Sequence, residues 1–550
     1  TEDYLERLQQ SLPALNLPVW DDELYLELHR GTYTTKADRK RQNRQLEVLL
    51  GTVERVRAMA AIARGVEYPL EALTTAWQKV LTNQFHDILP GTAIPQVFED
   101  ADRSDAEARA ICERELAVVL RDGESDKFCV WNGLNWARSV LVDLPDDESV
   151  VAVREVKTGR LLPIQRVEDG LLFPANVPSV GTVGYELVRD GGSPEYSSEL
   201  VVERDRLENS VVYVQLDTTT GDILQIFDKR TQRQLLSAPA GLQCFDDLGQ
   251  YWDAWNIDPD YESKPLHEFE LMSMEVVEVG QLRGAVRVVR QFRQSTVVQT
   301  LRLEANNPQL FIHTQLDWQD TYTLLKAAFP LSFSTPSATY EIPFGAIARS
   351  TVRETEIDAA KWEVPALRWA DMSGDGVGLA VLNDCKYGYD AKPDCLRLTL
   401  LKSPTWPHPT SDLGQHEFTY SLLPHGGDWR GAEVVRRGYE LNDLPMVLGE
   451  DWDTGSLLEI DSDNVVLAAL KRSEDNRAWI VRLYEAHGKA VEATMKLKCG
   501  IESLYSCDLL EREIEAAEFF DDRLVLPLSP FDIQTFRLNL GQQQIAPFLN

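Results

Sequence analysis

The spacing of apolar residues changes once along this 550-residue chain, near residue 126. Before that point, apolar residues recur every three or four positions, which is the period of an amphipathic α-helix. After it, short segments rich in Val, Leu, Phe and Tyr are separated by turn residues, as is typical of β-sandwiches. The sequence therefore predicts a multidomain chain of the α plus all-β class, in which a three-helix bundle is followed by β-sandwich domains.

Three helices are expected in the first 125 residues. The first spans 36–64 and the second spans 69–86, starting at a proline that suits a first helical turn. The third spans 92–121, with Thr92 placed to cap it. The expected inward positions of the three helices are Leu46, Leu49, Leu50, Val53, Val56, Ile62, Leu70, Leu73, Trp77, Val80, Leu81, Val97, Ala101, Ala108, Ile111, Leu116 and Val119.

The N-terminal turns of the first expected helix are strongly basic. Positive charge at that end is unfavourable for the helix dipole. We expect a solvent-exposed basic face, and the alternative is a face that meets an acidic neighbour. The basic residues are Lys36, Arg39, Lys40, Arg41 and Arg44.

Turn residues predict two β-hairpins. Asn306-Asn307-Pro308 separates strands expected at 297–303 and 310–316, and Thr220-Gly221-Asp222 separates strands expected at 211–216 and 223–227. Further strands are expected at 24–28, 377–382, 456–460, 465–470, 479–483 and 524–528.

The pattern divides the chain into five segments. They are an N-terminal segment (1–35), the three-helix bundle (36–125), a small β domain (126–195), a large β-supersandwich domain (196–445) and a C-terminal β domain (446–550).

The net charge of −33 argues against nucleic acid and anionic membranes as partners, because their phosphates would be repelled. No apolar run approaches the ~18 residues that a membrane span needs. The seven cysteines are scattered without a CxxC pair, which favours reduced thiols, a cytoplasmic protein and no cysteine metal cluster. Residue 1 is Thr and follows no signal peptide, so we expect a processed chain or a fragment of a longer one.

His86 and Asp87 are adjacent at the end of the second expected helix. Stepping about 100° per residue from Leu70 places the apolar residues up to Phe85 on one side and His86 roughly opposite. A packing histidine would lie within the apolar stripe, so His86 is expected to point towards solvent or another domain. One His and one Asp do not complete a zinc site, which needs three or four ligands. A surface histidine and a metal ligand both remain open.

Other chemical signals are weaker. No Gly-rich phosphate loop, nucleophile elbow or HExxH motif occurs. His416 and His425 could be loop ligands, although structural or surface roles are favoured. Three stretches combine aromatic rings with carboxylates, which suits sugars, although core packing explains each one singly. These stretches are 251–256, 368–371 and 383–390.

Taken together, several stretches resemble the retaining α-mannosidases of glycoside hydrolase family 38. Residues 26–34 (LELHRGTYT) and 83–92 (NQFHDILPGT) look like the middle domain of that family. The β region agrees at 251–256 (YWDAWN), 340–345 (YEIPFG) and 369–425, and the last of these looks like the cytosolic or vacuolar branch. The resemblance covers nearly the whole chain in the same order.

The resemblance implies a site that this chain shares with another piece. Family members begin with an α/β domain that carries the nucleophile, the acid/base carboxylate and a zinc-binding His-x-Asp pair, and that domain is absent here. No catalytic residue is therefore expected within this chain, and the N-terminal α/β catalytic domain is an expected partner. His86 matches the zinc ligand of the QxHD motif, Asp87 matches a residue that binds mannose hydroxyls, and Arg30 and Tyr33 border the sugar site.

The expected function is hydrolysis of terminal α-D-mannosyl residues from a mannose-containing oligosaccharide. One zinc ion per site would be only partly liganded by this chain, with cobalt as an alternative ion, and an oligomer is left open. The chain alone should then have little activity. One alternative is a stand-alone carbohydrate-binding or assembly protein without catalysis. Another is a different β-sandwich glycosidase with a carboxylate pair about 5 Å or ~6.5–9.5 Å apart within this chain.

Overall fold

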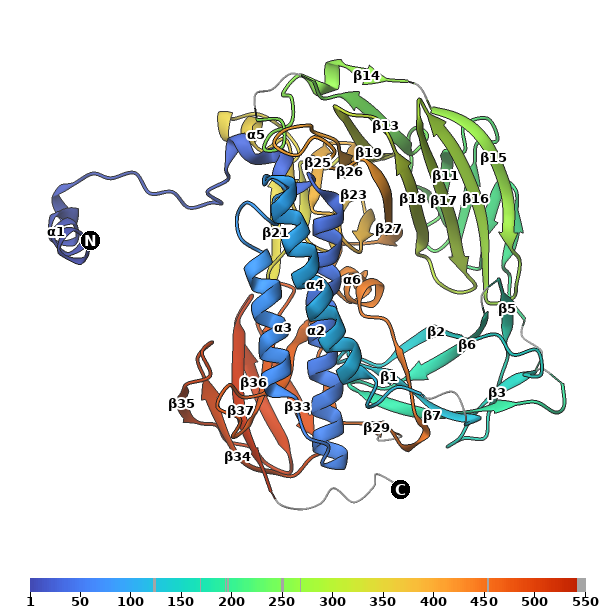
Figure 1. Cartoon of the computed structure of the whole chain (residues 1–550), viewed down its shortest axis with the longest axis vertical. Coiled ribbons are helices and arrows are strands. Elements are labelled where there is room, and N and C mark those ends of the chain that lie inside the picture. Colours follow the sequence, from blue (N-terminus) through green and yellow to red (C-terminus); the bar gives the residue numbers. More distant parts are fainter. Residues whose placement is uncertain are drawn as a thin grey trace.

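The computed structural model describes residues 1–121, 125–168, 170–192, 194, 197–248, 252–267, 269–452 and 455–541. Helices α2, α3 and α4 form a column through the centre of the molecule (Figure 1). A large β region lies beside one end of this column, and two smaller β regions lie on opposite sides of its other end. The predicted class, helices followed by β-sandwich domains, is confirmed.

The three central helices are α2 (Ala37–Arg64), α3 (Leu70–Asn83) and α4 (Pro95–Leu116). They lie where the sequence predicts helices, although α3 and α4 end earlier than expected. Their inward side chains belong to one buried cluster, because the period of 3.6 residues aligns them on facing stripes. Members of this cluster include Leu46, Leu50, Val53, Val56, Leu73, Val80, Ala108, Cys112 and Leu116.

The basic start of α2 is buried, so the favoured expectation of a solvent-exposed face is wrong. Arg39 is only 2% exposed, pairs with Asp105 and contacts Asp102 Oδ1 at 2.9 Å through Nη1. Arg41 lies 2.7 Å from a Glu417 carboxylate oxygen. The alternative, a face that meets acidic neighbours, is correct. These carboxylates come from α4 and from the distant strand β27 (Gly414–Gly426), which a local pattern does not reveal.

The large β region is built on a nine-stranded antiparallel sheet within the described residues. The predicted hairpin around residues 306–308 is confirmed as the pair β17–β18. In spatial order this sheet contains β15 (Phe269–Glu278), β16 (Arg283–Phe292), β17 (Ser295–Glu304), β18 (Leu310–Trp318), β27 (Gly414–Gly426), β24 (Val377–Asn383), β23 (Trp369–Gly374), β20 (Ser337–Ile342) and β21 (Gly345–Ser350).

Two further sheets pack with it around one hydrophobic core. The predicted hairpin around residues 220–222 is confirmed as the pair β10–β11. One sheet contains, in spatial order, β14 (Pro265–Leu266), β13 (Gly241–Asp246), β19 (Thr323–Pro330), β26 (Cys395–Lys402), β25 (Gly388–Lys392) and β22 (Val364–Pro365). The other contains β12 (Arg233–Gln234), β11 (Ile223–Asp228), β10 (Val212–Leu216), β9 (Arg206–Glu208) and β8 (Val201–Glu203).

The small β domain takes strands from two distant parts of the chain. Strand β28 pairs with β1, so residues expected in the C-terminal domain complete this earlier sheet. Its strands are β28 (Met446–Leu448), β1 (Lys127–Asn132), β7 (Gly181–Val188), β3 (Ala152–Glu155), β4 (Leu161–Leu162) and β29 (Gly455–Ser456), facing β2 (Arg138–Leu144), β6 (Gly170–Val177) and β5 (Gln165–Val167).

The C-terminal sandwich shares its hydrophobic core with the helices, since Leu46 and Leu50 belong to the same buried cluster as Leu467 and Leu483. Helix α6 (Val434–Asn442) packs between this sandwich and the large β region, since Val434 belongs to the same buried cluster as Tyr484 and Leu382. The two sheets of the sandwich contain β30 (Leu458–Ile460), β33 (Val491–Leu497) and β36 (Arg523–Leu528), and β31 (Val465–Arg472), β32 (Trp479–Glu485), β37 (Ile533–Leu540), β34 (Ile501–Cys507) and β35 (Glu513–Ala516).

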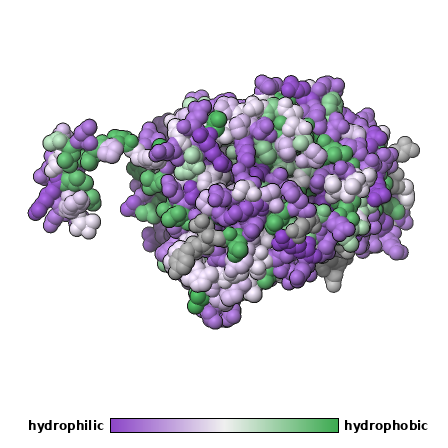
Figure 2. Space-filling view, turned by 90° about the horizontal axis from the view of Figure 1, so that it is seen from above, coloured by the Kyte–Doolittle hydropathy of each residue, from purple (hydrophilic) through white to green (hydrophobic). Residues whose placement is uncertain are grey.

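The residues before Asp22 extend away from the body as an arm (Figures 1 and 2), and the chain rejoins the body where Glu23 pairs with Arg349 and the Tyr25 hydroxyl donates to the Glu363 carbonyl. The arm contains α1 (Glu2–Ser11) and the 3-10 turn η1 (Leu12–Ala14), and η2 (Glu27–Tyr33) follows it. The predicted strand at 24–28 is wrong: residues 24–26 join no sheet among the described strands, residues 27 and 28 belong to η2, and Leu24 and Leu26 are exposed. Short elements in the remaining loops are η3 (Tyr261–Ser263), α5 (Glu356–Ala360) and η4 (Glu450–Trp452).

Six of the seven cysteines are buried, and Cys395 is partly buried. Burial raises the pKa of the Cys112 thiol to about 11, so this thiol is protonated and unreactive at neutral pH. Within the described ranges, no helix combines the length and hydropathy that crossing a bilayer requires.

Candidate functional site

His86 and Asp87 lie in the turn after α3, not on the helix itself. The helix ends at Asn83, whose side-chain amide donates to the Ala101 carbonyl and the Asp105 carboxylate of α4. The expectation that the helix reaches His86 is therefore wrong. Phe85, expected in the inward stripe, is 56% exposed because the helical rotation stops before it.

The side chains of His86 and Asp87 converge at the surface. His86 is 77% exposed, and its Nε2 lies 3.6 Å from Asp87 Oδ2. The other Asp87 oxygen, Oδ1, accepts a 2.9 Å hydrogen bond from Thr92 Oγ1. Helix α4 begins only at Pro95, so Thr92 closes this turn and does not cap the helix as expected. The result is a fixed carboxylate that presents one oxygen beside an exposed imidazole.

A buried lysine holds this turn against the rest of the molecule. Lys40 Nζ donates to the carbonyl oxygens of Thr35, Leu89 and Pro90 at 2.5, 2.9 and 3.2 Å. Gly91 permits the close approach: its φ is +88°, and a Cβ there would lie 2.5 Å from the Thr35 oxygen. The position of the His86–Asp87 pair therefore depends on α2 and on the segment that precedes it.

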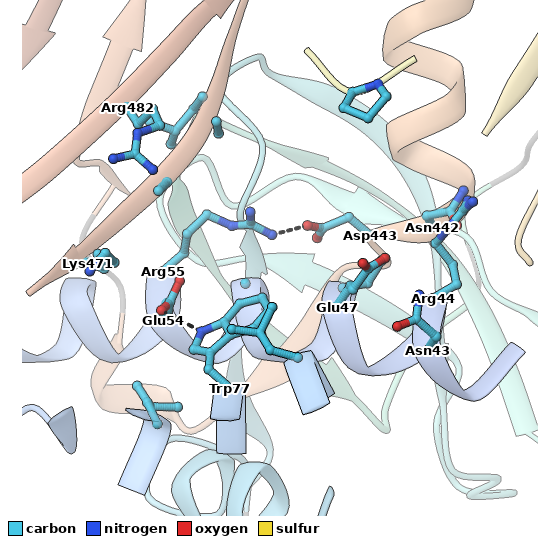
Figure 3. A pocket seen from close by; sticks show the side chains of 18 of the residues that line it. Asn43, Arg44, Glu47, Glu54, Arg55, Trp77, Asn442, Asp443, Lys471 and Arg482 are labelled. Carbon is cyan, nitrogen blue, oxygen red and sulfur yellow. Dashed lines mark hydrogen bonds and ion pairs between the residues drawn. The ribbon is translucent and has the colours of Figure 1, made fainter. Parts of the chain in front are cut away.

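Gln84, which begins the turn, also lines a cavity of about 800 Å³ between the helices and the β domains, and Figure 3 shows other residues of this lining. Its Nε2 donates to Asn43 Oδ1 at 3.1 Å and to Glu47 Oε1 at 2.8 Å. Deeper in the cavity, polar groups pair with each other: Trp77 donates to Glu54 at 2.9 Å, and Arg55 pairs with Asp443. The first pairing joins α3 to α2, and the second joins α2 to the residue that follows α6.

Arg30 and Tyr33 lie in η2. Arg30 is buried, and its Nε and Nη2 donate to the Ala360 carbonyl at 3.1 and 2.6 Å. Its guanidinium lies 4.6 Å from the centre of the Trp362 ring. Burial raises the pKa of Tyr33, so its hydroxyl stays protonated. Arg30 thus fixes the backbone beside the site, and a role of either residue in sugar binding stays a prediction.

The three aromatic and acidic stretches differ in exposure. Trp369 of the second stretch and Tyr389 of the third are fully buried, as core packing predicts. In the first stretch Trp252 is exposed, whereas Tyr251 lies outside the described residues. Trp406 contacts Trp252 with ring centres 4.7 Å apart. Local sequence patterns do not show that Trp406 meets Trp252, because the two residues lie far apart in the chain.

The two loop histidines have structural roles. His425 is 3% exposed, and its Nε2 lies 2.7 Å from Asp371 Oδ2. His416 Nε2 lies 2.8 Å from the Asp412 carbonyl oxygen, and burial lowers its pKa. Both imidazoles are thus engaged within the β region, which agrees with the favoured expectation.

The described residues contain no group of three or more His, Cys, Asp or Glu side chains that could hold a metal ion. His86 and Asp87 nevertheless offer an imidazole and a carboxylate, donor types that zinc binds, at an exposed position. They therefore fit a metal as one part of a shared site, and a complete tetrahedral set would need further ligands.

Three family models match the chain. They are the alpha mannosidase middle domain at residues 27–121, the glycosyl hydrolases family 38 C-terminal domain at 207–410, and the family 38 C-terminal beta sandwich domain at 464–536. The first two matches include the turn that carries His86 and the stretch that carries Trp252 and Trp406.

Curated relatives match over nearly the full chain. Alpha-mannosidase 2C1 of Homo sapiens is 34% identical over 98% of this chain and 53% of its own length. Alpha-mannosidase G of Dictyostelium discoideum is 28% identical over 97% of this chain and 54% of its own length. This chain thus spans about half the length of the curated relatives it matches. The solved structure of an alpha-mannosidase from Enterococcus faecalis shares the fold, with a TM-score of 0.80 and 15% identity over 98% of this chain and 72% of that one.

Proposed function

The chain belongs to glycosyl hydrolase family 38, whose middle and C-terminal domains it contains, and we propose that it is the corresponding part of a retaining, zinc-assisted α-mannosidase. The observation that carries this proposal is the exposed His86–Asp87 pair. It lies within the matched middle domain, on a turn that a buried lysine and a close-approach glycine hold in place. Its exposure is what a site shared with another domain requires.

The two side chains have distinct proposed roles. His86 would be one neutral imidazole ligand of zinc, with cobalt as the alternative, and such an ion supplies Lewis-acid polarisation of bound hydroxyl groups. Asp87, fixed through Oδ1 by Thr92, would accept hydrogen bonds from sugar hydroxyls through Oδ2. Arg30 would keep the neighbouring backbone in place through its bonds to the Ala360 carbonyl.

The bond-breaking groups would come from an N-terminal α/β catalytic domain. An aspartate of that domain would attack the anomeric carbon while the leaving oxygen takes a proton from an acid/base carboxylate. Water, deprotonated by the same carboxylate, would then release mannose from the aspartyl ester. The substrate would be a mannose-containing oligosaccharide, a neutral ligand that suits a chain of net charge −33. We further propose a cytoplasmic location, because the seven cysteines are scattered along the chain without a CxxC pair.

The test compares this 550-residue chain with the full-length product of its gene. We expect the full-length protein to hydrolyse 4-nitrophenyl α-mannoside and to hold a metal ion. The 550-residue chain should hydrolyse this substrate poorly and bind the metal ion weakly. In the full-length protein, His86→Ala should lower activity and metal content by more than about 100-fold, since even partners of metal ligands contribute about 10- to 100-fold. His267→Ala, at an exposed histidine of the β region, is the matched control.

Two outcomes would count against the proposal. Efficient hydrolysis by the 550-residue chain alone would place the nucleophile within it. A full-length product without mannosidase activity that still binds oligosaccharides, unaffected by His86→Ala, would favour a carbohydrate-binding protein without catalysis.

A further inference from the structure

Three tryptophans from two distant loops form one cluster. The ring centres of Trp252 and Trp406 are 4.7 Å apart, and Trp255 lies 5.4 Å from each of them. The Trp255 and Trp406 planes are inclined by only 33°, whereas Trp252 stands at 86° to Trp255 and 73° to Trp406. The cluster is thus a corner, with two rings as a floor and one as a wall.

Two of these rings face solvent. Trp252 is 49% exposed and Trp406 is 48% exposed, although large aromatic side chains are normally well buried. Trp255 is partly buried. Both outer residues therefore keep exposed surface that a ligand can contact.

The exposed rings are held by buried polar contacts. The Asp253 carboxylate is 6% exposed and accepts hydrogen bonds from the backbone N–H groups of Thr405 and Trp406 at 2.9 and 3.2 Å. Trp252 has a φ of +71°, which is costly for a bulky residue and is typical of functional positions. A surface that served solubility alone would require neither the strained backbone nor the buried carboxylate.

The cluster lies at the same end of the helices as the His86–Asp87 turn. Gly31 N–H donates to the Trp255 carbonyl at 2.8 Å, and Thr35 Oγ1 donates to the Ala254 carbonyl at 2.8 Å. The carbonyl of Thr35 in turn accepts from Lys40, which also binds the turn at Leu89. One short segment, residues 31–35, therefore holds both features.

We propose that Trp252, Trp255 and Trp406 form a carbohydrate subsite that stacks a pyranose unit of a neutral oligosaccharide. The C–H face of a pyranose suits an indole floor, and the perpendicular wall limits how the ring lies on it. The assignment to mannose-containing chains rests on the proposed function. The subsite would hold a sugar unit beyond the one that Asp87 contacts. It would therefore contribute to the binding of longer oligosaccharides.

The first test measures the binding of linear mannotriose to the 550-residue chain. Calorimetry and the change in tryptophan fluorescence both report this binding. Trp406→Ala and Trp252→Ala should each weaken mannotriose binding about tenfold, because each substitution removes roughly one aromatic contact and its buried area. Trp20→Ala is the matched control, because Trp20 is 52% exposed in the N-terminal arm and belongs to no ring cluster described here. Trp406→Phe should restore part of the affinity. Thermal unfolding shows whether each variant is folded.

A kinetic test separates this proposal from the proposed function. In the full-length protein, Trp406→Ala should raise KM for mannotriose about tenfold and leave kcat/KM for 4-nitrophenyl α-mannoside unchanged, whereas His86→Ala should abolish both activities. Mannotriose binding that depends on Trp406 in a protein without mannosidase activity would support the subsite and refute the enzyme. Folded Trp252→Ala and Trp406→Ala variants that bind mannotriose like the wild type would overturn the subsite and leave the rings as a contact surface for another part of the protein.

Discussion

The side-chain nitrogen of Lys40 on α2 donates a 2.9 Å hydrogen bond to the carbonyl oxygen of Leu89, in the turn that carries His86 and Asp87. The same Nζ also reaches the carbonyl oxygens of Thr35 and Pro90. A single buried side chain thus joins α2, the segment before it and the candidate site. The geometry of the exposed pair is set from inside the protein.

Lys40→Met should destabilise the protein. The substitution keeps most of the side-chain volume and leaves three buried carbonyl oxygens without their donor, so we expect the free energy of unfolding to fall by about 2–3 kcal/mol. Lys79→Met is the control: Lys79 pairs with the exposed Glu107 at the surface, and its loss should change stability little. Denaturant unfolding followed by circular dichroism measures both. Equal effects of the two substitutions would show that the three carbonyl contacts contribute nothing.

The same lysine predicts a pH dependence. Burial lowers the pKa of Lys40 from 10.5 to about 7. Between these two values the unfolded chain binds a proton that the folded protein has lost, so the free energy of unfolding rises with pH in this window. The stability difference between wild type and Lys40→Met should therefore grow from pH 7 towards pH 10. A difference that is constant with pH would place the pKa near its ordinary value.

Gly91→Ala should be far more harmful than Gly65→Ala. Both glycines have positive φ, +88° and +67°, so both substitutions carry the same conformational cost of about 1 kcal/mol. Only at Gly91 would the new Cβ also meet a backbone oxygen, at 2.5 Å, whereas nothing lies within 4 Å of it at Gly65. We expect Gly91→Ala to cost several kcal/mol in thermal or chemical unfolding. Similar losses at the two positions would contradict the close contact between the turn and Thr35.

Substitutions of His86 and His425 should have different effects on the free energy of unfolding. His86→Ala removes an exposed side chain, so the free energy of unfolding should stay within about 0.5 kcal/mol of the wild type. His425→Ala removes the partner of the buried Asp371 carboxylate and should cost about 3 kcal/mol or more. Calorimetric unfolding of the two variants distinguishes a site residue from a structural one. A large loss for His86→Ala would mean that its ring supports the fold.

Much of the fold follows from local sequence patterns. The central helices and the hairpins β10–β11 and β17–β18 lie where the apolar period and the turn residues predict them, because both signals act over a few neighbouring residues. The expected exposure of His86 is also correct. The helical rotation that predicts it does not reach His86, however, because α3 ends at Asn83. The predicted strand at 24–28 failed because alternation alone does not provide a partner strand.

By itself, the sequence determined the change from helices to strands, the family resemblance and the expected exposure of His86. Only the tertiary structure decided what these elements contact. Arg39 is buried because α4 supplies Asp102 and Asp105, and Trp406 meets Trp252 because two distant loops converge. Local periodicity reports which face of an element is apolar, but not which distant residue covers that face. The partners are chosen by packing and charge pairing across the folded chain, so they become visible only in three dimensions.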